Sequence, residues 1–563
     1  MPKVRPLQQS FSSGEISPRL FGRTDLEQYR HAVAEMTNFV ATPYGNAYRR
    51  EGTEYMAHDA TGQEGLYGRL FEFNVDPALA FAIAVTRTKV RVFDRNGQVA
   101  SSYINDDAGL IDAENTWIGA AVGGGSEVIY SRGLVTLNGG TGGASFAAIR
   151  QQVTTSNPLQ THRFSVRMQE ATEWEVRIGT TQGGAEIYQA TYTTDSARIS
   201  ILPGDATFWI SVRSNSGFNN VVDFFSVENI EDPASTVVEF DSPWTTPEAL
   251  NNLHYAMPPA VDAMFFACDQ VSPWALELND GVWSFNELQF NSDDAGQPPW
   301  PSGENPATLE FHQGRLWFAH TRSKPNTVWA STIGDFFDFT IGDGDQATDG
   351  LEFDVQQRGD IEWVLSAKAL HIGFSDSETV IGSAGPIITG TDAFAEQQSA
   401  YGSVNIQPKT IATVHAFINT TRRKLMAATY SDERKTYVPT DMTYMSEHIT
   451  ESGVVSIGYV SAQNSTVICI LANGDIAGFT FEPTKGTAGW WKGTTQGRFV
   501  DVAIVRDRGI PVPYFMVIRE VNGEERIFIE RYSGDFMDCH ETQQFPSPVT
   551  VVENLEHLEG QTV

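Results

Sequence analysis

The stretch RLFEFNVDPALAFAIAVTRTKVRVFDRNGQV, residues 69–99, contains the pattern that decides the fold. Apolar and polar residues alternate in Phe71-Glu-Phe-Asn-Val75 and again in Lys89-Val-Arg-Val-Phe93, with the period of two that is typical of β-strands. The Asn96-Gly97 pair that follows is a turn signal of β-hairpins. This stretch therefore predicts consecutive antiparallel strands.

Similar units recur downstream, with starts separated by about 45–50 residues, an interval typical of propeller blades. They lie at 261–288, 309–331, 361–383, 411–437, 455–492 and 500–532. Together with residues 69–99 they make seven candidate two-strand units. We therefore predict an all-β protein with a β-propeller of about six to eight blades. The alternative is a row of unrelated β-sandwich domains with similar hairpin spacing.

The gap between the first and second units has a different composition. From residue 121 to 230 it holds 7 Arg, no Lys and 9 Asp+Glu, so it is close to neutral. Short strand-like runs alternate there with Gly-Gly and Pro-Gly-Asp turns, which is typical of sandwiches. This composition predicts a jelly-roll or β-sandwich domain inserted at 118–240.

The whole chain is strongly acidic. Its 563 residues include 38 Lys+Arg and 70 Asp+Glu, a formal net charge of −32, yet 41% of residues are hydrophobic and only 19% are charged. The chain therefore has material for more than one packed core and is not a disordered acidic tail. Because the surface lacks an excess of cations to neutralise phosphates, DNA or RNA reading and adhesion to anionic membranes are disfavoured. Since the insertion is nearly neutral, the excess acid lies on the propeller.

Short motifs of catalysis are absent from the sequence. It contains no HExxH, GxSxG, GxGxxG or GxxxxGK[ST] pattern, and its 11 His residues show no paired metal spacing. Cys268, Cys469 and Cys539 are far apart, which indicates small buried side chains rather than ligands or disulfides. The Asp-rich loop 342–350 has an alanine at the third ligand position of a calcium loop, and we interpret it as a solvated turn. We predict no enzymatic activity, no cofactor and no metal site.

Long apolar runs are absent as well. No stretch approaches about 18 uninterrupted apolar residues, and residues 1–20 contain no apolar run of signal-peptide length. We expect a protein without a membrane-spanning segment that stays in the cytoplasm where it is made.

The most specific pattern lies near the N-terminus. FSSGEISPRLFGRTDLEQY (11–29) is followed by Thr37-Asn-Phe39 and then by PYGNAYRREGT (43–53). This series resembles the opening of the tail nozzle, or tail tubular protein B-like, family of short-tailed bacteriophages. That family begins with a Gly-Gly/Glu-Ile-Ser element, a Gly-Arg and Asp pair, an Asn, and an Arg-rich end before Gly-Thr. The matching residues here are Gly14, Ile16, Ser17, Gly22, Arg23, Asp25, Asn38, Arg49, Arg50, Gly52 and Thr53.

Further matches to this family follow in the same order and cover nearly the whole chain except the insertion. They include Gly314-Arg-Leu-Trp-Phe-Ala319, Tyr401-Gly-Ser403, Asp441-Met-Thr443 and residues 473–491. Residues 555–563 resemble the entry to a further small β module of longer relatives. Whether that module is truncated, encoded separately or lost is left open.

The predicted domain organisation has five parts. Residues 1–60 are an extended segment that joins the propeller, and they are too polar to make a core of their own. Residues 61–117 are the first propeller part, 118–240 the inserted sandwich, 241–545 the main propeller part, and 546–563 a C-terminal tail.

The resemblance implies a structural virion protein. It implies a homohexameric nozzle ring that extends the portal and adaptor channel, retains packaged DNA and conducts it during ejection. The implied partners are further copies of the chain, the phage adaptor protein, tail fibres or spikes, and passing double-stranded DNA without sequence readout. The protein would lie at the virion tail tip after assembly in the bacterial host cytoplasm. An acidic wall suits this task because DNA carries one negative charge per about 1.7 Å of axis.

Arg422, Arg423 and Lys424 are a local exception to the acidic surface. Their functional interpretation is contact with a neighbouring subunit or with DNA. The alternative is that they form surface ion pairs with nearby acids.

Two other function classes stay open. The insertion could bind a host surface glycan, with a host-attachment role, through a stacking platform of aromatic side chains, or the same side chains could be core residues. The third class is an enzyme that degrades surface polysaccharide through a carboxylate pair, but 70 acidic residues do not single out such a pair. The aromatic residues are Trp174, Trp209, Tyr188 and Tyr192.

Overall fold

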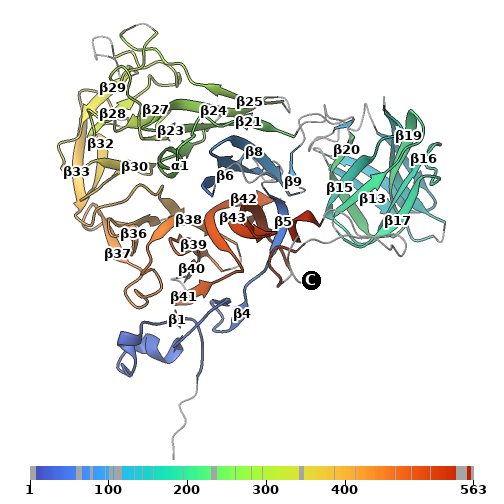
Figure 1. Cartoon of the computed structure of the whole chain (residues 1–563), viewed down its shortest axis with the longest axis horizontal. Coiled ribbons are helices and arrows are strands. Elements are labelled where there is room, and N and C mark those ends of the chain that lie inside the picture. Colours follow the sequence, from blue (N-terminus) through green and yellow to red (C-terminus); the bar gives the residue numbers. More distant parts are fainter. Residues whose placement is uncertain are drawn as a thin grey trace, which may run out of the picture.

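In the computed structural model, small antiparallel sheets form a ring, and a second pair of sheets lies to one side of it (Figure 1). The structure describes residues 8–58, 66–75, 80–95, 97–99, 105–106, 117–131, 134–142, 144–155, 157–194, 196–229, 237–259, 261–279, 282–294, 296–341, 346, 348–383, 385, 387–411, 414–462, 464–482, 485–507, 509–534, 536–540 and 555–558. Part of the Asp-rich loop 342–350 and most of the predicted tail 546–563 lie outside these residues.

The ring consists of seven four-stranded blades in the described part of the chain. This confirms the predicted all-β propeller of six to eight blades. The first three blades are β6 (Gly68–Asn74), β7 (Ala80–Thr86), β8 (Lys89–Asp94) with β21 (Glu239–Asp241) and the short β9 (Gly97–Gln98); β22 (His254–Ala256), β23 (Ala263–Cys268), β24 (Val271–Asn279), β25 (Val282–Glu287); and β26 (Thr308–His312), β27 (Arg315–Ala319), β28 (Thr327–Ala330), β29 (Leu351–Asp354).

The remaining four blades follow in chain order. They are β30 (Ile361–Ser366), β31 (Leu370–Phe374), β32 (Glu378–Ser383), β33 (Ala393–Ser399); β34 (Lys409–Ile411), β35 (Val414–Ile418), β36 (Leu425–Ser431), β37 (Thr436–Asp441); β38 (Val454–Val460), β39 (Thr466–Leu471), β40 (Ile476–Glu482), β41 (Thr487–Gly493); and β42 (Arg498–Asp507), β43 (Ile510–Val521), β44 (Glu524–Tyr532) with β5 (Thr53–His58).

One apolar core lies between each pair of neighbouring blades, including the seventh and the first. Each sheet is therefore covered on both faces, which explains continuous apolar strands such as β7 and β39. The outer strands are different: β33 and β37 are largely polar and half-exposed. Their weak alternation is why the sequence predicted two-strand units where the structure has four strands.

The seventh blade is completed by a strand from the other end of the chain. β5 pairs with β44 in antiparallel register, from Phe528 opposite His58 to Tyr532 opposite Thr53. Near the C-terminus, a short 3-10 helix (Glu556–Leu558) returns to this strand, and the His557 ring stacks on Tyr55 at a centroid distance of 4.0 Å. The ring of blades is thus closed by residues that the chain begins with.

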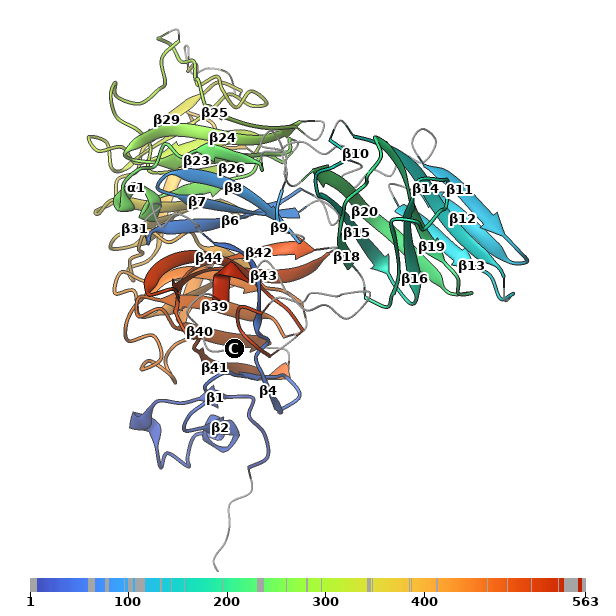
Figure 2. The same ribbon diagram turned by 45° about the vertical axis from the view of Figure 1, so that its right-hand side comes forward.

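The second body is a β-sandwich that lies beside the propeller (Figure 2). Its two antiparallel sheets share one apolar core. One sheet contains β10 (Asn105–Asp106), β12 (Ser126–Ser131), β13 (Leu134–Gly139), β15 (His162–Glu170), β18 (Ser196–Ile201) and β20 (Asn219–Asn229); the other contains β11 (Ile118–Val122), β14 (Phe146–Thr154), β16 (Trp174–Gly179), β17 (Tyr188–Tyr192) and β19 (Thr207–Ser214).

The sandwich is inserted between the third and fourth strands of the first blade. Its first paired strand, β10, begins before the predicted boundary at 118, and β21, at the predicted end of the insertion, pairs with β8 of the propeller. The chain therefore leaves the first blade and returns to complete it.

An ion pair lies among the inner strands at the centre of the propeller. Glu72 of β6 accepts hydrogen bonds from the Lys409 ammonium (2.7 Å), the Tyr255 hydroxyl (2.9 Å) and the Ile504 N–H (3.0 Å), which come from three other blades. Burial alone would raise the pKa of Glu72, but Lys409 and these hydrogen bonds outweigh burial and lower it. Groups from four blades thus meet at this carboxylate.

Candidate functional site

The residues of the N-terminal motif, residues 14–53, build an arm that fastens onto the propeller (Figure 1). The arm contains β1 (Gly14–Glu15), two 3-10 helices (Pro18–Leu20 and Glu27–His31), β2 (Ala32–Val33), and the hairpin of β3 (Phe39–Ala41) and β4 (Ala47–Arg49), and it ends in β5. Nearly every matching residue has a definable structural task, and these tasks fall into three groups.

The first group attaches β1 to the sixth blade. Gly14 pairs in parallel with Trp490 of β41, and a Cβ atom at position 14 would lie 2.2 Å from the Trp490 carbonyl oxygen. Ile16 is buried, and the Ser17 N–H donates to the Met445 carbonyl at 2.8 Å. Position 14 requires glycine because its backbone lies directly against the backbone of Trp490.

Glu15, next to Gly14, is an anchor that the family match did not single out. Its carboxylate is 1% exposed and accepts hydrogen bonds from the Met36 N–H (2.7 Å), with Lys492 and His448 each at 2.8 Å. Burial raises the pKa of Glu15, but Lys492, the Met36 N–H and His448 together outweigh burial and lower it. A carboxylate inside an otherwise small and apolar motif is the signal that could have revealed this anchor.

The second group is an exposed turn. Arg23 forms two hydrogen bonds with Asp25, at 2.8 and 2.7 Å, and both side chains are more than half exposed. The Arg23 guanidinium lowers the pKa of the Asp25 carboxyl. The Gly22 N–H donates to the Tyr29 hydroxyl at 3.1 Å. These three matching residues shape the turn itself and stay apart from the rest of the site.

The third group closes the seventh blade. The Arg50 side chain is 6% exposed and donates to the Asn38 side-chain oxygen (2.8 Å), the Thr494 carbonyl (2.7 Å) and both oxygens of Asp538 (2.8 and 2.6 Å). Burial alone would lower the pKa of Arg50, but the hydrogen bonds and charge of Asp538 outweigh it. Asn38 has a left-handed φ of 59°. One arginine thus joins the arm, the sixth-to-seventh blade connection and the segment after β44.

Gly52 and Thr53 complete the same contact. A Cβ atom at position 52 would lie 2.0 Å from the Met537 carbonyl oxygen, so only glycine fits there. Thr53 is fully buried; its hydroxyl donates to Glu530 and accepts the Cys539 N–H at 2.9 Å. Glu530 is itself paired with Arg519.

Arg49, by contrast, is exposed. Its guanidinium lies over the Phe536 ring, 5.8 Å from the centroid, and Phe536 and Met537 are 54% and 67% exposed. These three side chains border a pocket of about 480 Å³ that Asn38, Arg50, Thr494, Thr495, Gln496, Arg519 and Asp538 also line. An arginine beside exposed aromatic and methionine side chains is a composition that protein interfaces favour.

The structure places Arg422, Arg423 and Lys424 in the turn between β35 and β36, where all three are exposed. Lys424 pairs with Asp441 at 2.8 Å, as the ion-pair interpretation predicts. Within the described residues no ion pair is formed by Arg422 or Arg423. The turn contacts the same 442–453 connection as the arm: Thr450 donates to the Arg423 carbonyl at 2.6 Å, and Ser446 to the Glu15 carbonyl at 2.6 Å.

Of the two interpretations of the sandwich aromatic residues, the core interpretation holds for three of the four. Trp174 and Tyr192 are buried and stack on each other in the core at 4.9 Å, and Tyr188 packs against the same core. Trp209 is half-buried and lies outside that core cluster. Alternation along each strand separates the two faces, which composition alone does not reveal.

Among the residues that the structure describes, no three His, Cys, Asp or Glu side chains are grouped as a metal ion would require. Cys268, Cys469 and Cys539 are buried and unpaired, as expected. No helix in the described ranges combines the length and the apolar character needed to cross a bilayer.

Comparison with known proteins gives likeness of fold alone. No protein-family model matches the chain, and no curated protein matches it. Regucalcin, a calcium-binding protein from Agrobacterium tumefaciens, is 12% identical over 51% of this chain and 93% of its own, with a TM-score of 0.28. The WD40 repeats of RRP9 are 8% identical over 50% and 97%, with a TM-score of 0.30. TmCBM61, solved with β-1,4-galactotriose, is 11% identical over 22% and 92%, with a TM-score of 0.16. These likenesses assign no function to the chain.

Proposed function

We propose that this protein is a structural virion protein, a subunit of the tail nozzle ring of a short-tailed bacteriophage. In this role it extends the portal and adaptor channel, retains packaged DNA and conducts it during ejection, without catalysis. The observation that carries the proposal is that the residues of the family-like motif form one fastening device: Gly14, Arg50, Gly52 and Thr53 attach the arm to the last two blades.

The inner strands of the propeller bear on the path of the DNA. Because Glu72, Tyr255 and Lys409 bond to one another across the centre, DNA in this proposal passes through the lumen of a ring of propellers and not through each propeller. The net charge of −32 then keeps the DNA from adhering to the wall, provided that the excess acid faces the lumen.

The arm side of the molecule is the proposed assembly surface. Large apolar side chains are exposed on the arm and on the segments it touches, as at Phe21 (50%), Phe39 (47%), Tyr44 (83%) and Tyr444 (72%), and such exposure marks interaction sites. We assign this surface to contacts with a neighbouring copy or the adaptor protein. Arg422 and Arg423, on the adjacent turn, are further candidates for subunit or DNA contact.

Electron-microscope images of the purified protein and of the virion tail test the proposal. We expect six-fold rings, and antibody labelling at the tail tip. Arg49→Glu should abolish ring formation, whereas Arg30→Glu, an identical charge change at another exposed arm position, should leave the rings intact. A protein that stays monomeric at micromolar concentration and is missing from purified virions would overturn the proposal.

A further inference from the structure

The outer face of one sandwich sheet carries a net positive charge, although the chain as a whole is strongly negative. In the sheet β11-β14-β19-β16-β17, residues such as Ile149, Val176 and Ile210 point into the core, so their neighbours in each strand point outward. The five strands hold three arginines and a single acidic residue, whereas the whole chain holds 38 Lys+Arg and 70 Asp+Glu.

Strand register brings the three arginines together on this face. Arg150 of β14 and Arg177 of β16 both lie opposite Ser211 of β19, so the two arginine backbones are about 10 Å apart with a small residue between them. Arg213, two residues further along β19, lies opposite Glu175. The three arginines therefore lie around Ser211, which is only 2% exposed.

The single carboxylate of the face is already occupied. Glu175 pairs with Arg177 at 3.0 Å and lies 3.7 Å from Arg213, and it accepts hydrogen bonds from Gln189 and from Asn215 (3.1 Å). On this face, guanidinium and amide groups together bind the carboxylate of Glu175.

Arg150 has no such partner. It forms no ion pair with the described residues, and its Nε atom is buried without a hydrogen-bond acceptor among them. Burial and the charge of Arg177 lower the pKa of Arg213, and Arg150 adds to this effect. Glu175 opposes this effect, but one carboxylate does not balance three arginines. Such departures from local charge balance concentrate at functional sites.

The surroundings provide apolar walls for a ring-shaped ligand. The Arg213 guanidinium stacks on the Phe146 ring at 3.8 Å, and the half-buried Trp209 lies opposite Gln152 in the next row beside Arg150. The backbone at Gly183, in the loop before β17, approaches the Arg150 guanidinium closely: a Cβ atom at this position would lie 3.3 Å from Arg150 Nε. An indole face beside amide and guanidinium donors suits a pyranose ring with polar substituents.

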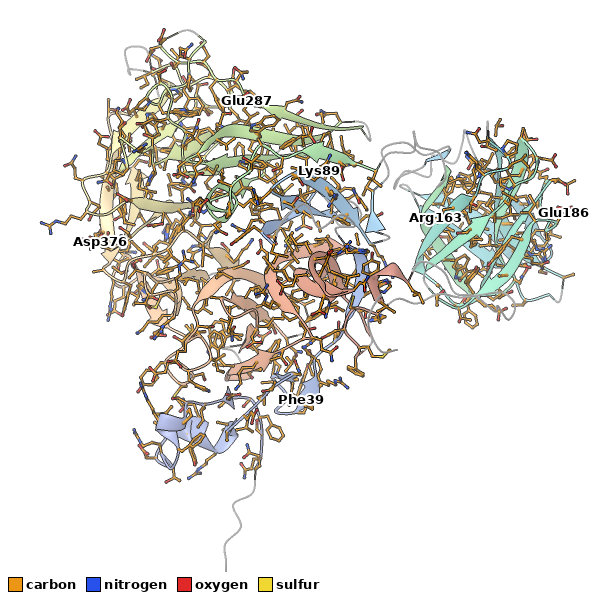
Figure 3. All side chains as sticks on the ribbon, viewed as in Figure 1. Phe39, Lys89, Arg163, Glu186, Glu287 and Asp376 are labelled. Carbon is orange, nitrogen blue, oxygen red and sulfur yellow. The ribbon has the colours of Figure 1, made fainter. Side chains whose placement is uncertain are left out.

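This face lies on the side of the sandwich away from the propeller, and its arginine side chains are half-buried. Figure 3 shows Glu186, at the edge of this sheet, on the far side of the sandwich from the propeller, while Arg163 of the other sheet lies on the propeller side. The Glu186 carboxylate is held by its own loop, through the Thr180 N–H (3.2 Å) and the Thr181 hydroxyl (3.2 Å).

We propose that this outer face binds an acidic saccharide, with a ligand carboxylate on Arg150 and a pyranose ring against Trp209. Charge complementarity selects an anionic ligand, and the donor set around Glu175 selects a carboxylate, because guanidinium binds carboxylate with two parallel hydrogen bonds. The inference does not depend on the nozzle proposal, since either a nozzle subunit or another surface protein could carry such a site.

Isothermal titration of the full-length protein with oligogalacturonate tests this inference. Neutral galacto-oligosaccharide of the same length should not bind measurably. Arg150→Gln should weaken oligogalacturonate binding at least tenfold, and Trp209→Ala should weaken it to a similar degree. Arg163→Gln removes the same charge from the opposite sheet and should leave affinity unchanged, which separates the site from net charge.

Other results would overturn the inference. Equal affinity for dextran sulfate with no effect of Trp209→Ala would mean adhesion by charge alone. Unchanged binding in Arg150→Gln, or no binding to oligogalacturonate in wild type, would exclude the proposed site. If Arg150→Gln instead lowered the oligomer mass in sedimentation without any saccharide binding, the face would be a contact between copies of the chain.

Discussion

Two groups of arginines in this molecule are balanced in opposite ways. In the last blade, Arg50 and Arg519 are buried, and each is paired with a carboxylate, Asp538 or Glu530. On the sandwich, Arg177 and Arg213 share Glu175, and the nearby Arg150 forms no ion pair with the described residues. Where each arginine is paired with its own carboxylate, no positive charge is left for a ligand, and the ion pairs stabilise the fold. Where arginines outnumber carboxylates, a positive charge remains that a ligand can neutralise. The difference separates structural from functional cations in a protein whose net charge is negative.

Breaking the ion pair between Arg50 and Asp538 should have the largest effect on stability. Arg50→Met removes the partner of Asp538 and three further hydrogen bonds, and we expect the free energy of unfolding to fall by about 4 kcal/mol. A urea titration followed by tryptophan fluorescence measures the change. The neighbouring Arg49→Met is the control; because Arg49 is exposed, it should change stability by no more than about 0.5 kcal/mol. Equal effects of the two substitutions would contradict the comparison.

Removing Glu175, the one carboxylate among the sandwich arginines, should have the next largest effect on stability. Burial raises the pKa of Glu175, but Arg177, Asn215 and Gln189 outweigh it and lower the pKa, so the carboxylate is charged. Glu175→Gln leaves three arginines without compensation and should cost about 3 kcal/mol of sandwich stability. The loss should be larger at 10 mM than at 500 mM salt because screening weakens repulsion. Thermal melts at both salt concentrations, with the exposed Glu173→Gln as control, measure it; a salt-independent loss would argue against repulsion.

Glu310, in the propeller, extends the comparison from arginines to a carboxyl group. Burial raises the pKa of Glu310 to about 7, against a weaker opposing effect of the hydrogen bond from the Phe311 N–H. A raised carboxyl pKa means that folding stability is lost as pH rises from the unfolded value of about 4.5 through about 7. Glu310→Gln lacks this loss.

We therefore expect Glu310→Gln to be more stable than wild type at pH 8 by about 2 kcal/mol, less than the full shift implies because the side chain is partly exposed. At pH 4 the two proteins should be equally stable. Urea midpoints at both pH values decide the outcome, and a difference that is the same at pH 4 and pH 8 would contradict it.

Substituting Arg150 should have the smallest effect on stability. Arg150→Gln should leave the free energy of unfolding within about 0.5 kcal/mol of wild type, or raise it slightly by relieving repulsion from Arg213. The same urea titration measures this. A loss as large as that of Arg50→Met would mean that Arg150 belongs to the structural class.

The propeller was predictable because its signal is local. Alternation in runs such as Phe71-Glu-Phe-Asn-Val75 and the recurring interval located all seven blades, since each inner pair of strands is adjacent in the chain. The outer strands were missed because they are polar and short, as in β33. The strand β5 was not assigned to the seventh blade because its partner β44 lies more than four hundred residues away.

Neither group of arginines could be paired from sequence. Arg50 meets Asp538 across 488 positions, and no local pattern links them. Arg150, Arg177 and Arg213 meet only through the register of three strands, and a shift of one residue would place any of them in the core. Composition did indicate that the insertion is nearly neutral, but not that its arginines gather on one face.

The order in which the parts of the chain leave the ribosome follows from the closing strand. β5 is synthesised more than four hundred residues before its partner β44, so at about 5–20 residues per second β5 waits roughly half a minute to a minute and a half for it. The sandwich strands, contiguous from 105 to 229, can fold during that time. A prematurely terminated chain would therefore carry a finished sandwich on an open row of blades, with unpaired strand edges that invite aggregation or proteolysis. The ring of blades can therefore close only after translation has passed β44.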